Sequence, residues 1–414
     1  MNTSPRTKVL MLGWEFPPHS TGGLGVACLG LAQALTASNV DISFVLPRRI
    51  NVSHDSIRLL FADVPNISFT TVDSSLQGYV TSSEYDRVMR ASGGPGQYGN
   101  TLLEEVRRYA LLVRDIAKRE TFDIIHAHDW LSMLAGVEAK KVSGKPLIVH
   151  VHATSYDQAG GDNVNPHTYA IERYAMHEAD RVVAVSGYTK NIIVQKYGVN
   201  PDKVRVVHNG VLHQSDHYEG KVLALKEAGY KIVLYLGRVT IQKGVDYFLR
   251  AAQKALQYEP DTVFVVAGTG DMEAQMLREA GWLGISDKVL FLTKFVGGEE
   301  RASLLKSADI FVMPSVSEPF GLVPLEALIE GGTPVIISKQ SGVSEVLRHA
   351  LRVDFWDTDE MANQIVAILQ HPGLAHQLSE YGREEANSVT WQKAAEKCIE
   401  IYQELTGFWR PAVS

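Results

Sequence analysis

The chain has 414 residues, of which 45% are hydrophobic and 21% charged, and its formal net charge at pH 7 is −7. This length predicts two large or three ordinary domains, and the composition is typical of a folded globular protein. The two cysteines, Cys28 and Cys398, are too few and too far apart for a disulfide framework or a zinc knuckle. No apolar run approaches the roughly 20 residues of a membrane span, and the start lacks a signal-peptide pattern, so we expect a cytoplasmic protein.

The charge is unevenly distributed along the chain. Up to Gly210 there are 21 Lys and Arg residues against 20 Asp and Glu, whereas the remaining residues contain 19 against 27. This change in charge balance after Gly210 predicts two distinct domains. A net negative charge argues against a nucleic-acid partner, because nucleic-acid-binding proteins gather Lys and Arg on one face.

Short apolar segments alternate with longer helical segments along most of the chain, which is typical of a parallel sheet covered by helices. The pattern pauses between Val211 and Lys221 and then restarts, so we expect a boundary near residue 215 and two Rossmann-like domains in tandem. The expected strands are 9–12, 42–46, 124–127, 147–151, 182–186 and 204–208 before it, and 232–236, 263–267, 289–292, 310–313 and 334–337 after it.

Two segments interrupt this regular pattern. Residues 73–100 are rich in Ser, Gly and Tyr and are too long for an ordinary connection, so we expect a surface loop. Residues 391–405 have a helical apolar spacing, which predicts a helix that either ends the second domain or crosses back to the first. We therefore expect an N-terminal domain over 1–215, a C-terminal domain over 216–395, and a C-terminal helix and tail over 396–414.

The segment from Ser317 to Val335 is the most informative part of the sequence, and its groups together suit a nucleotide sugar, which offers both a phosphate and hydroxyls. Glu318 lies in the loop after an expected strand, and the following helix tolerates Pro324 in its first turn. The amides of Gly321 and Leu322 then lie at the positive end of that helix, where a phosphate binds favourably. Glu326, about one turn into the helix, is placed to contact sugar hydroxyls. The alternative is an ordinary strand–loop–helix unit with two solvated glutamates.

Two fixed cations, Arg238 and Lys243, follow the first strand of the second domain, and ligands of open α/β sheets bind at such strand ends. A planar guanidinium and a compact ammonium suit a diphosphate that gains negative charge as it departs. The spacing is not that of a Walker loop. A solvated basic turn is an equally good interpretation of these two residues alone.

A glycine loop, Thr21–Gly25, precedes the first helix. It lacks the third small residue and the tight turn of a dinucleotide-binding fingerprint, and no acidic residue ends the second strand. We interpret Gly22 and Gly23 as positions where backbone amides approach a ligand.

Two His-x-His pairs, at 126–128 and 150–152, raise the alternative of a metallohydrolase. No further carboxylate with ligand spacing lies nearby, so we expect no metal. We interpret Asp129 and His152 as hydrogen-bonding groups for a polar substrate, and His126 and His150 as structural.

These segments, in this order, resemble the retaining glycosyltransferases of the GT-B fold, specifically the glycogen and starch synthases and the group 1 glycosyltransferases. The matching motifs are Thr21–Gly25, His126–Trp130, Asn209–Gly210, the pair Arg238 and Lys243, and the E-x7-E pair Glu318 and Glu326. One departure is Ser20, because glycogen synthases usually have Lys at this position.

The resemblance implies that Glu326 holds the nucleotide ribose and that Glu318 and His152 lie by the transferred sugar. It implies that Arg238 and Lys243 neutralise the departing diphosphate, so that no metal or other cofactor is needed. The same resemblance places Asp129 near the acceptor and the amides of Gly321 and Leu322 against the donor.

We therefore expect a retaining hexosyltransferase that moves glucose from a nucleotide diphosphate sugar to a glucan or another hydroxyl acceptor, with the site in a cleft that closes between the domains. The alternatives are a group 1 transferase acting on a small-molecule, lipid or cell-surface glycan acceptor, a nucleotide-sugar epimerase or phosphorylase on the same fold, and a catalytically silent sugar- or nucleotide-binding protein.

Overall fold

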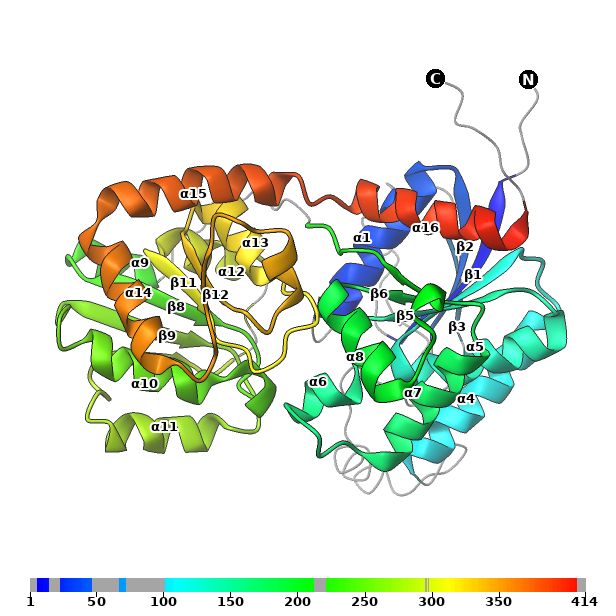
Figure 1. Cartoon of the computed structure of the whole chain (residues 1–414), viewed down its shortest axis with the longest axis horizontal. Helices are drawn as coiled ribbons and strands as arrows, with labels where there is room; N and C mark the ends of the chain where they lie inside the picture. Colours follow the sequence, from blue (N-terminus) through cyan, green and yellow to red (C-terminus); the bar gives the residue numbers. More distant parts are fainter. Residues whose placement is uncertain are drawn as a thin grey trace. The chain divides into compact units, whose positions relative to one another are not determined.

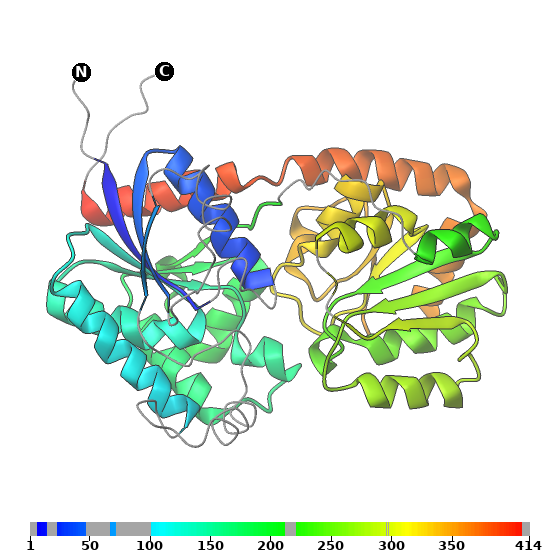
Figure 2. The same ribbon diagram turned by 180° about the vertical axis from the view of Figure 1, so that it is seen from behind.

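The structure is a computed structural model, shown in Figures 1 and 2. It describes residues 6–14, 23–46, 67–71, 101–211, 221–294, 296 and 298–407. The chain divides into two compact units. The first unit contains residues 1–155, 164–210 and 391–414, and the second contains residues 156–163 and 211–390. The boundary expected near residue 215 and the surface loop expected over 73–100 lie outside the described residues.

The first unit is built on a parallel sheet with the strand order β3-β2-β1-β4-β5-β6-β7. Its strands are nearly continuous apolar runs because helices cover both faces of the sheet. They are β1 (Thr7–Leu12), β2 (Val40–Leu46), β3 (Ile67–Thr71), β4 (Ile124–His128), β5 (Leu147–Val151), β6 (Arg181–Ala184) and β7 (Val204–Val206).

Figures 1 and 2 show α4 and α5 side by side on one face of this sheet, and α1 against α16 on the other. The helices of this unit are α1 (Gly23–Ala37), α4 (Leu102–Ala117), α5 (Asp129–Ser143), α7 (Pro166–Glu178), α8 (Gly187–Tyr197), the 3₁₀ turn η1 (Pro201–Lys203) and α16 (Trp391–Thr406). Helix α6 (Ser155–Ala159) belongs to the second unit from Tyr156 onward.

The second unit has a parallel sheet with the order β10-β9-β8-β11-β12-β13. Taken in chain order, this is the 3-2-1-4-5-6 arrangement of a Rossmann fold. The strands are β8 (Lys231–Leu236), β9 (Thr262–Ala267), β10 (Val289–Leu292), β11 (Ile310–Met313), β12 (Val335–Ser338) and β13 (Leu351–Val353).

Helices α10, α11 and α14 bury their apolar faces in one core against this sheet. In α10 the buried residues Val245, Phe248, Leu249 and Ala252 follow the helical spacing i, i+3, i+4, i+7. The helical segments are α9 (Lys221–Glu227), η2 (Ile241–Lys243), α10 (Val245–Ala255), α11 (Glu273–Trp282), α12 (Gly298–Ser307), α13 (Val323–Glu326), the π-helical turn η3 (Ala327–Gly331), η4 (Gly342–Glu345), α14 (Thr358–Gln370) and α15 (Pro372–Asn387).

Gly244 determines how closely the loops after β8 and β11 approach each other. Its φ is +66°, and a Cβ built there would lie 2.1 Å from the carbonyl oxygen of Pro314. An L side chain at this position would therefore force the two loops apart. The absence of a side chain brings η2 close to the segment that contains Glu318.

The structure confirms the expectation of two Rossmann-like domains in tandem and shows each expected strand, with small shifts at the ends. The strands that the sequence pattern did not predict, β3 and β13, are edge strands. The helix predicted over residues 391–405 is α16, and it packs within the first unit. There His126 Nδ1 lies 2.7 Å from Tyr402 Oη, and Arg181 forms an ion pair with Glu404.

Candidate active site

Lys243 and Glu318 meet in the second unit, at the carboxyl edge of its sheet. Lys243 Nζ donates a hydrogen bond to Glu318 Oε2 over 2.5 Å, and Ser315 Oγ donates to the same oxygen over 3.2 Å. The Lys243 and Glu318 side chains are 21% and 10% exposed. Because β8 and β11 are adjacent parallel strands, the loops that follow them emerge at one edge, where open α/β sheets bind ligands.

Arg238 lies in the same group of loops and is linked to Glu318 through Gln242. Arg238 Nη2 donates to Gln242 Oε1 over 3.3 Å, and Gln242 Nε2 donates to the carbonyl oxygen of Ser317 over 3.1 Å. The amide of Val316 also donates to the carbonyl oxygen of Gln242. Gln242, which is buried, therefore ties the loop carrying Arg238 to the loop carrying Glu318.

Glu326 is buried on α13, beside α12. Arg301 Nη1 lies 3.1 Å from Glu326 Oε1, whereas Glu326 Oε2 has no hydrogen-bond partner among the described residues. Burial raises the pKa of Glu326, the Arg301 charge opposes that effect, and the nearby Glu330 carboxylate adds to it. The side chain thus has one oxygen held by a cation and one that is unsatisfied.

Gly321 and Leu322 connect Glu318 to α13. Gly321 has a φ of +99°, and Leu322 is the N-cap residue of α13. This loop is held in place by backbone hydrogen bonds to the segment after β12. The amide of Val343 donates to the carbonyl oxygen of Phe320, and Glu318 exchanges backbone hydrogen bonds with the neighbourhood of Ser341. These hydrogen bonds therefore hold the segment predicted to contact the donor in one backbone conformation.

Asp129 and His152, the other predicted catalytic residues, are brought together in the first unit. Asp129 begins α5 directly after β4 and has a φ of 57°, which is uncommon for a residue other than glycine. Its Oδ1 accepts hydrogen bonds from the amides of His152, over 2.7 Å, and of Ala153, over 3.3 Å. Asp129 thus positions the turn after β5 that carries His152.

The four histidines of the two His-x-His pairs form one stacked cluster. His126 Nε2 lies 3.1 Å from His150 Nδ1, and His128 Nδ1 lies 2.9 Å from His152 Nε2. Burial lowers the pKa of His126 and His152 to about 3, and it lowers the pKa values of His128 and His150 well below the usual range. The rings are therefore neutral at pH 7, so each ring has one N–H group and one lone pair.

Three nitrogens of this cluster have no hydrogen-bond partner among the described residues: His128 Nε2, His150 Nε2 and His152 Nδ1. Two sets of ligand atoms lie within 4.8 Å of one another, one from Cys28, His128 and His152 and one from His126, His128 and His150. His126 and His128 stack face to face, as do His150 and His152, with ring centroids 4.5 and 4.3 Å apart. The hydrogen-bonded pairs lie edge to edge, with centroids 5.2 Å apart. This geometry favours neither a polar ligand nor a metal ion over the other.

The glycine loop is described only in part. Gly23 is the first residue of α1, and nothing lies within 4 Å of a Cβ built there. Gly22 lies outside the described residues. In the described part of the chain, none of the helices combines the length and the hydropathy that crossing a bilayer requires.

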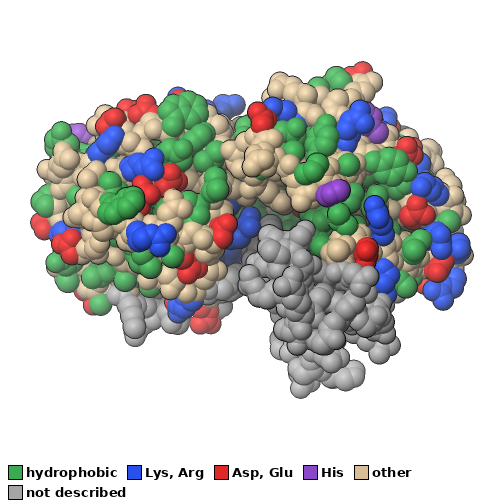
Figure 3. Space-filling model, turned by 90° about the horizontal axis from the view of Figure 1, so that it is seen from below, with side chains coloured by type: hydrophobic (Ala, Val, Ile, Leu, Met, Phe, Trp, Pro, Cys, Tyr) green, Lys and Arg blue, Asp and Glu red, His purple; other side chains and the backbone are tan. Residues whose placement is uncertain are grey.

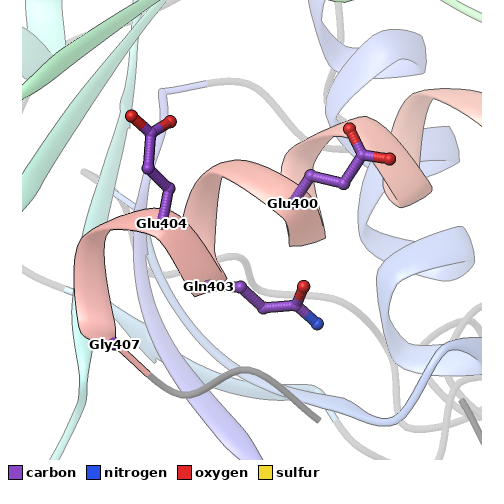
Figure 4. Close-up of a pocket in the computed structure, with 4 residues that line it drawn as sticks. All are labelled: Glu400, Gln403, Glu404 and Gly407. Carbon is purple, nitrogen blue, oxygen red and sulfur yellow. The ribbon is translucent and has the colours of Figure 1, made fainter. Parts of the chain in front are cut away.

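A surface pocket lies away from the predicted site residues, at the end of α16 (Figure 4). It is lined by Glu400, Gln403, Glu404 and Gly407, and Glu404 is already paired with Arg181. Acidic and basic side chains are interspersed over the face drawn in Figure 3, as on an ordinary solvated surface. Neither feature adds a residue to the candidate site.

Sequence reasoning missed Arg301, Gln242, Ser315 and Tyr402, all of which contact predicted residues. For Ser315 a signal existed, because it lies two residues before the predicted site segment. For the others no local motif was available.

Comparison with known proteins identifies the family. Residues 222–385 match the family described as glycosyl transferases group 1, and residues 21–214 match glycosyltransferase family 4. The chain is 30% identical over 310 residues to a D-inositol 3-phosphate glycosyltransferase of Saccharomonospora viridis, covering 70% of this chain and 72% of that protein. It is 26% identical over 417 residues to a glycogen synthase of Mycobacterium tuberculosis, covering 95% of this chain and 94% of that protein.

Solved structures share the fold. Sucrose-phosphate synthase from Thermosynechococcus elongatus superimposes with a TM-score of 0.75 at 19% identity, covering 97% of this chain and 100% of that chain. HepE from Anabaena, solved in complex with UDP-glucose, gives a TM-score of 0.68 at 16% identity, with the same coverage. The chain therefore belongs to the group 1 glycosyltransferases and has their GT-B fold of two Rossmann-like domains in tandem.

Proposed function

We propose that the protein is a retaining glycosyltransferase that moves a hexose, with glucose as the expected sugar, from a nucleotide diphosphate sugar to a hydroxyl acceptor. The observation that carries this proposal is the cluster of Arg238, Lys243 and Glu318 at the carboxyl edge of the second sheet. Group 1 membership supports sugar transfer, and this cluster supports a diphosphate leaving group.

The transfer breaks the bond between the anomeric carbon of the sugar and a phosphate oxygen, and the acceptor oxygen forms the new bond on the same face of the sugar. The acceptor hydroxyl loses its proton in this step, and the departing diphosphate takes it up. Negative charge grows on the diphosphate as that bond breaks. Arg238 and Lys243 would stabilise this charge, and fixed charges act most strongly on charge that appears only in the transition state. Because these cations serve the diphosphate, we propose that the reaction needs no metal ion or other cofactor.

The remaining predicted residues take roles around the donor and the acceptor. Glu326 would accept hydrogen bonds from the ribose, and the amides of Gly321 and Leu322 would contact the phosphates or the sugar. Glu318 and His152 would lie beside the transferred sugar, with the glycines at 22 and 23 also on the donor. Asp129 would lie toward the acceptor. On this assignment residues 1–215 form the acceptor domain and residues 216–395 the donor domain.

The donor and the first candidate acceptor are supported by likeness to named proteins. HepE from Anabaena has been solved with UDP-glucose, which favours a nucleotide diphosphate glucose as donor. The similarity to a glycogen synthase extends over 95% of this chain and favours a glucan acceptor.

A second candidate acceptor is a small phosphorylated polyol. It is favoured by the 30% identity to a protein named D-inositol 3-phosphate glycosyltransferase. The two candidates share the donor chemistry and differ only in the acceptor, so one assay separates them.

The test has two stages. First, thermal unfolding is followed with ADP-, UDP- and GDP-glucose, because a bound ligand raises the apparent stability of the protein. Second, the stabilising donor is incubated with glycogen or with an inositol phosphate, and labelled sugar in the acceptor is measured together with its anomeric configuration. Lys243→Ala serves as the inactive variant, and Arg250→Ala, on the surface of α10, as the matched active control. Inversion of configuration would reject the retaining mechanism, and donor consumption without acceptor would indicate an epimerase.

A further inference from the structure

Arg301 is the cation that contacts the buried carboxylate of Glu326. Its Nη1 lies 3.1 Å from Glu326 Oε1, and the two side chains are 21% and 6% exposed. Arg301 belongs to the first half of α12, whereas Glu326 is the last residue of α13. The ion pair therefore connects two consecutive helical segments of the second unit.

The position of α12 is determined by its contact with η3. A Cβ on Gly331 would lie 2.6 Å from the carbonyl oxygen of Leu305, so a side chain there would push α12 away. Thr333 Oγ1 donates a hydrogen bond to that same carbonyl oxygen over 2.7 Å. This close packing holds α12 at the distance that allows Arg301 to reach Glu326.

The second oxygen of Glu326 points to a ligand. Glu326 Oε2 is shielded from solvent and has no hydrogen-bond partner among the described residues. A buried carboxylate oxygen without a partner is costly, and such groups in native proteins call for an explanation. A sugar hydroxyl that donates to Oε2 would remove this cost.

The charges around Glu326 show what Arg301 contributes. Burial and the neighbouring Glu330 both favour the protonated carboxyl group, and Arg301 is the group that opposes them. A protonated carboxyl group would present a donor where a ribose hydroxyl needs an acceptor.

We propose that Arg301 is a positioning residue for donor binding: it holds Oε1 of Glu326, keeps the carboxylate ionised, and leaves Oε2 to accept a hydrogen bond from the ribose. This inference rests on the proposed function and adds a determinant of ribose recognition outside the E-x7-E pair. Arg301 acts through Glu326 and does not itself contact the reacting atoms.

The experiment titrates the full chain with UDP-glucose and ADP-glucose by calorimetry between pH 5.5 and 8.5. At pH 7, Arg301→Ala should raise the Kd of the bound donor on the order of tenfold, the size expected for a charge-assisted contact. In Arg301→Ala, donor binding should reach its full strength only at a higher pH than in the wild type, because Glu326 loses the cation that favours its ionised form. Arg301→Lys should restore most of the affinity, and kcat should change much less than KM.

Two controls separate this role from a purely structural one. Arg250→Ala also removes an arginine from a surface ion pair, with Glu279, and should bind donor normally. In the Glu326→Gln background, Arg301→Ala should cause no further loss of donor affinity, because the effects of two substitutions are not additive when one residue acts through the other.

The outcomes distinguish this inference from the proposed function. If Glu326→Gln weakens donor binding and Arg301→Ala does not, the inference is wrong and the function stands. The inference is also wrong if Arg301→Ala binds weakly with the pH profile of the wild type, or if its loss persists in the Glu326→Gln background. If the wild type binds neither nucleotide sugar, the proposed function fails and this inference fails with it.

Discussion

Lys243 Nζ and Glu318 Oε2 lie 2.5 Å apart, so the cation expected to bind the donor diphosphate is already paired with a carboxylate. This pairing orients the Lys243 side chain, which is 21% exposed. It also means that a diphosphate must share Lys243 with Glu318 or displace that carboxylate. We therefore expect substitutions at these two residues to change donor binding in opposite directions.

Replacing either cation should reduce turnover strongly. Arg238→Ala and Lys243→Ala should each lower kcat by about 10²- to 10³-fold, because each cation acts on charge that develops in the transition state. Circular dichroism should show an unchanged fold. Lys254→Ala, which removes a half-exposed lysine of α10, is the control and should retain activity. Near-normal turnover in both site variants would contradict the diphosphate assignment.

Glu318→Gln should separate binding from turnover. Without the carboxylate, Lys243 is released to the diphosphate and like-charge repulsion falls, so a nucleoside diphosphate should bind several-fold more tightly. Turnover should nevertheless fall if Glu318 lies by the transferred sugar. Calorimetry with the nucleoside diphosphate measures the first effect, and Glu360→Gln on α14 is the control. Weaker nucleotide binding would mean that Glu318 supports the diphosphate site instead of competing for it.

The sequence predicted the parts of the fold that repeat along the chain. Parallel strands buried on both faces are continuous apolar runs, and such runs can be recognised in a sequence without knowing which strands pair. The missed strands β3 and β13 are edge strands; Leu351–Val353 has only three residues, too few to show a period. Arg301 contacts Glu326, which is 25 positions away in the sequence. Gln242 contacts Ser317 in the predicted site segment, 75 positions away, and Tyr402 contacts His126, 276 positions away. Such contacts follow from how the helices pack, which no local spacing predicts.

Glu326→Gln should weaken donor binding and stabilise the protein. A ribose contact is made equally in the ground and transition states, so KM for the donor should rise more than kcat falls. Burial raises the pKa of Glu326, so the folded protein keeps this proton to a higher pH than the unfolded chain does. Stability therefore falls as pH rises from the pKa of this glutamate in the unfolded chain toward its raised pKa in the folded protein, and Glu326 lowers the stability at pH 7.

The measurement is the melting temperature of both proteins between pH 4 and 8. Glu326→Gln should melt higher than the wild type at pH 7, and the difference should shrink toward pH 4, where the glutamate of the unfolded chain also becomes largely protonated. A collapse of kcat with an unchanged donor KM would show that Glu326 has a role other than ribose binding.

The histidine cluster should make the protein sensitive to mild acid. Burial holds the pKa of His126 and His152 at about 3, whereas a histidine in the unfolded chain has a pKa near 6.5. Between these values the unfolded chain binds more protons, so stability is lost as pH falls below about 6.5. The melting temperature should therefore decline from pH 7 to pH 5. His152→Gln should show a shallower decline, and His376→Gln, at an exposed position, should follow the wild type. Parallel curves for all three proteins would mean that the cluster does not carry this dependence.

Activity should survive complete removal of divalent metal ions. Arg238 and Lys243 are expected to neutralise the charge on the leaving diphosphate, which is the role that a divalent cation would otherwise fill. After exhaustive dialysis against EDTA, kcat and the donor KM should match those of the untreated enzyme, and added Mg²⁺ or Mn²⁺ should have little effect. Loss of activity that Zn²⁺ restores would reverse this conclusion. The unpartnered nitrogens of His128 and His152 would then become candidate ligands, and cobalt substitution would test them, because the absorption spectrum of bound Co²⁺ reports tetrahedral coordination whether or not the enzyme turns over.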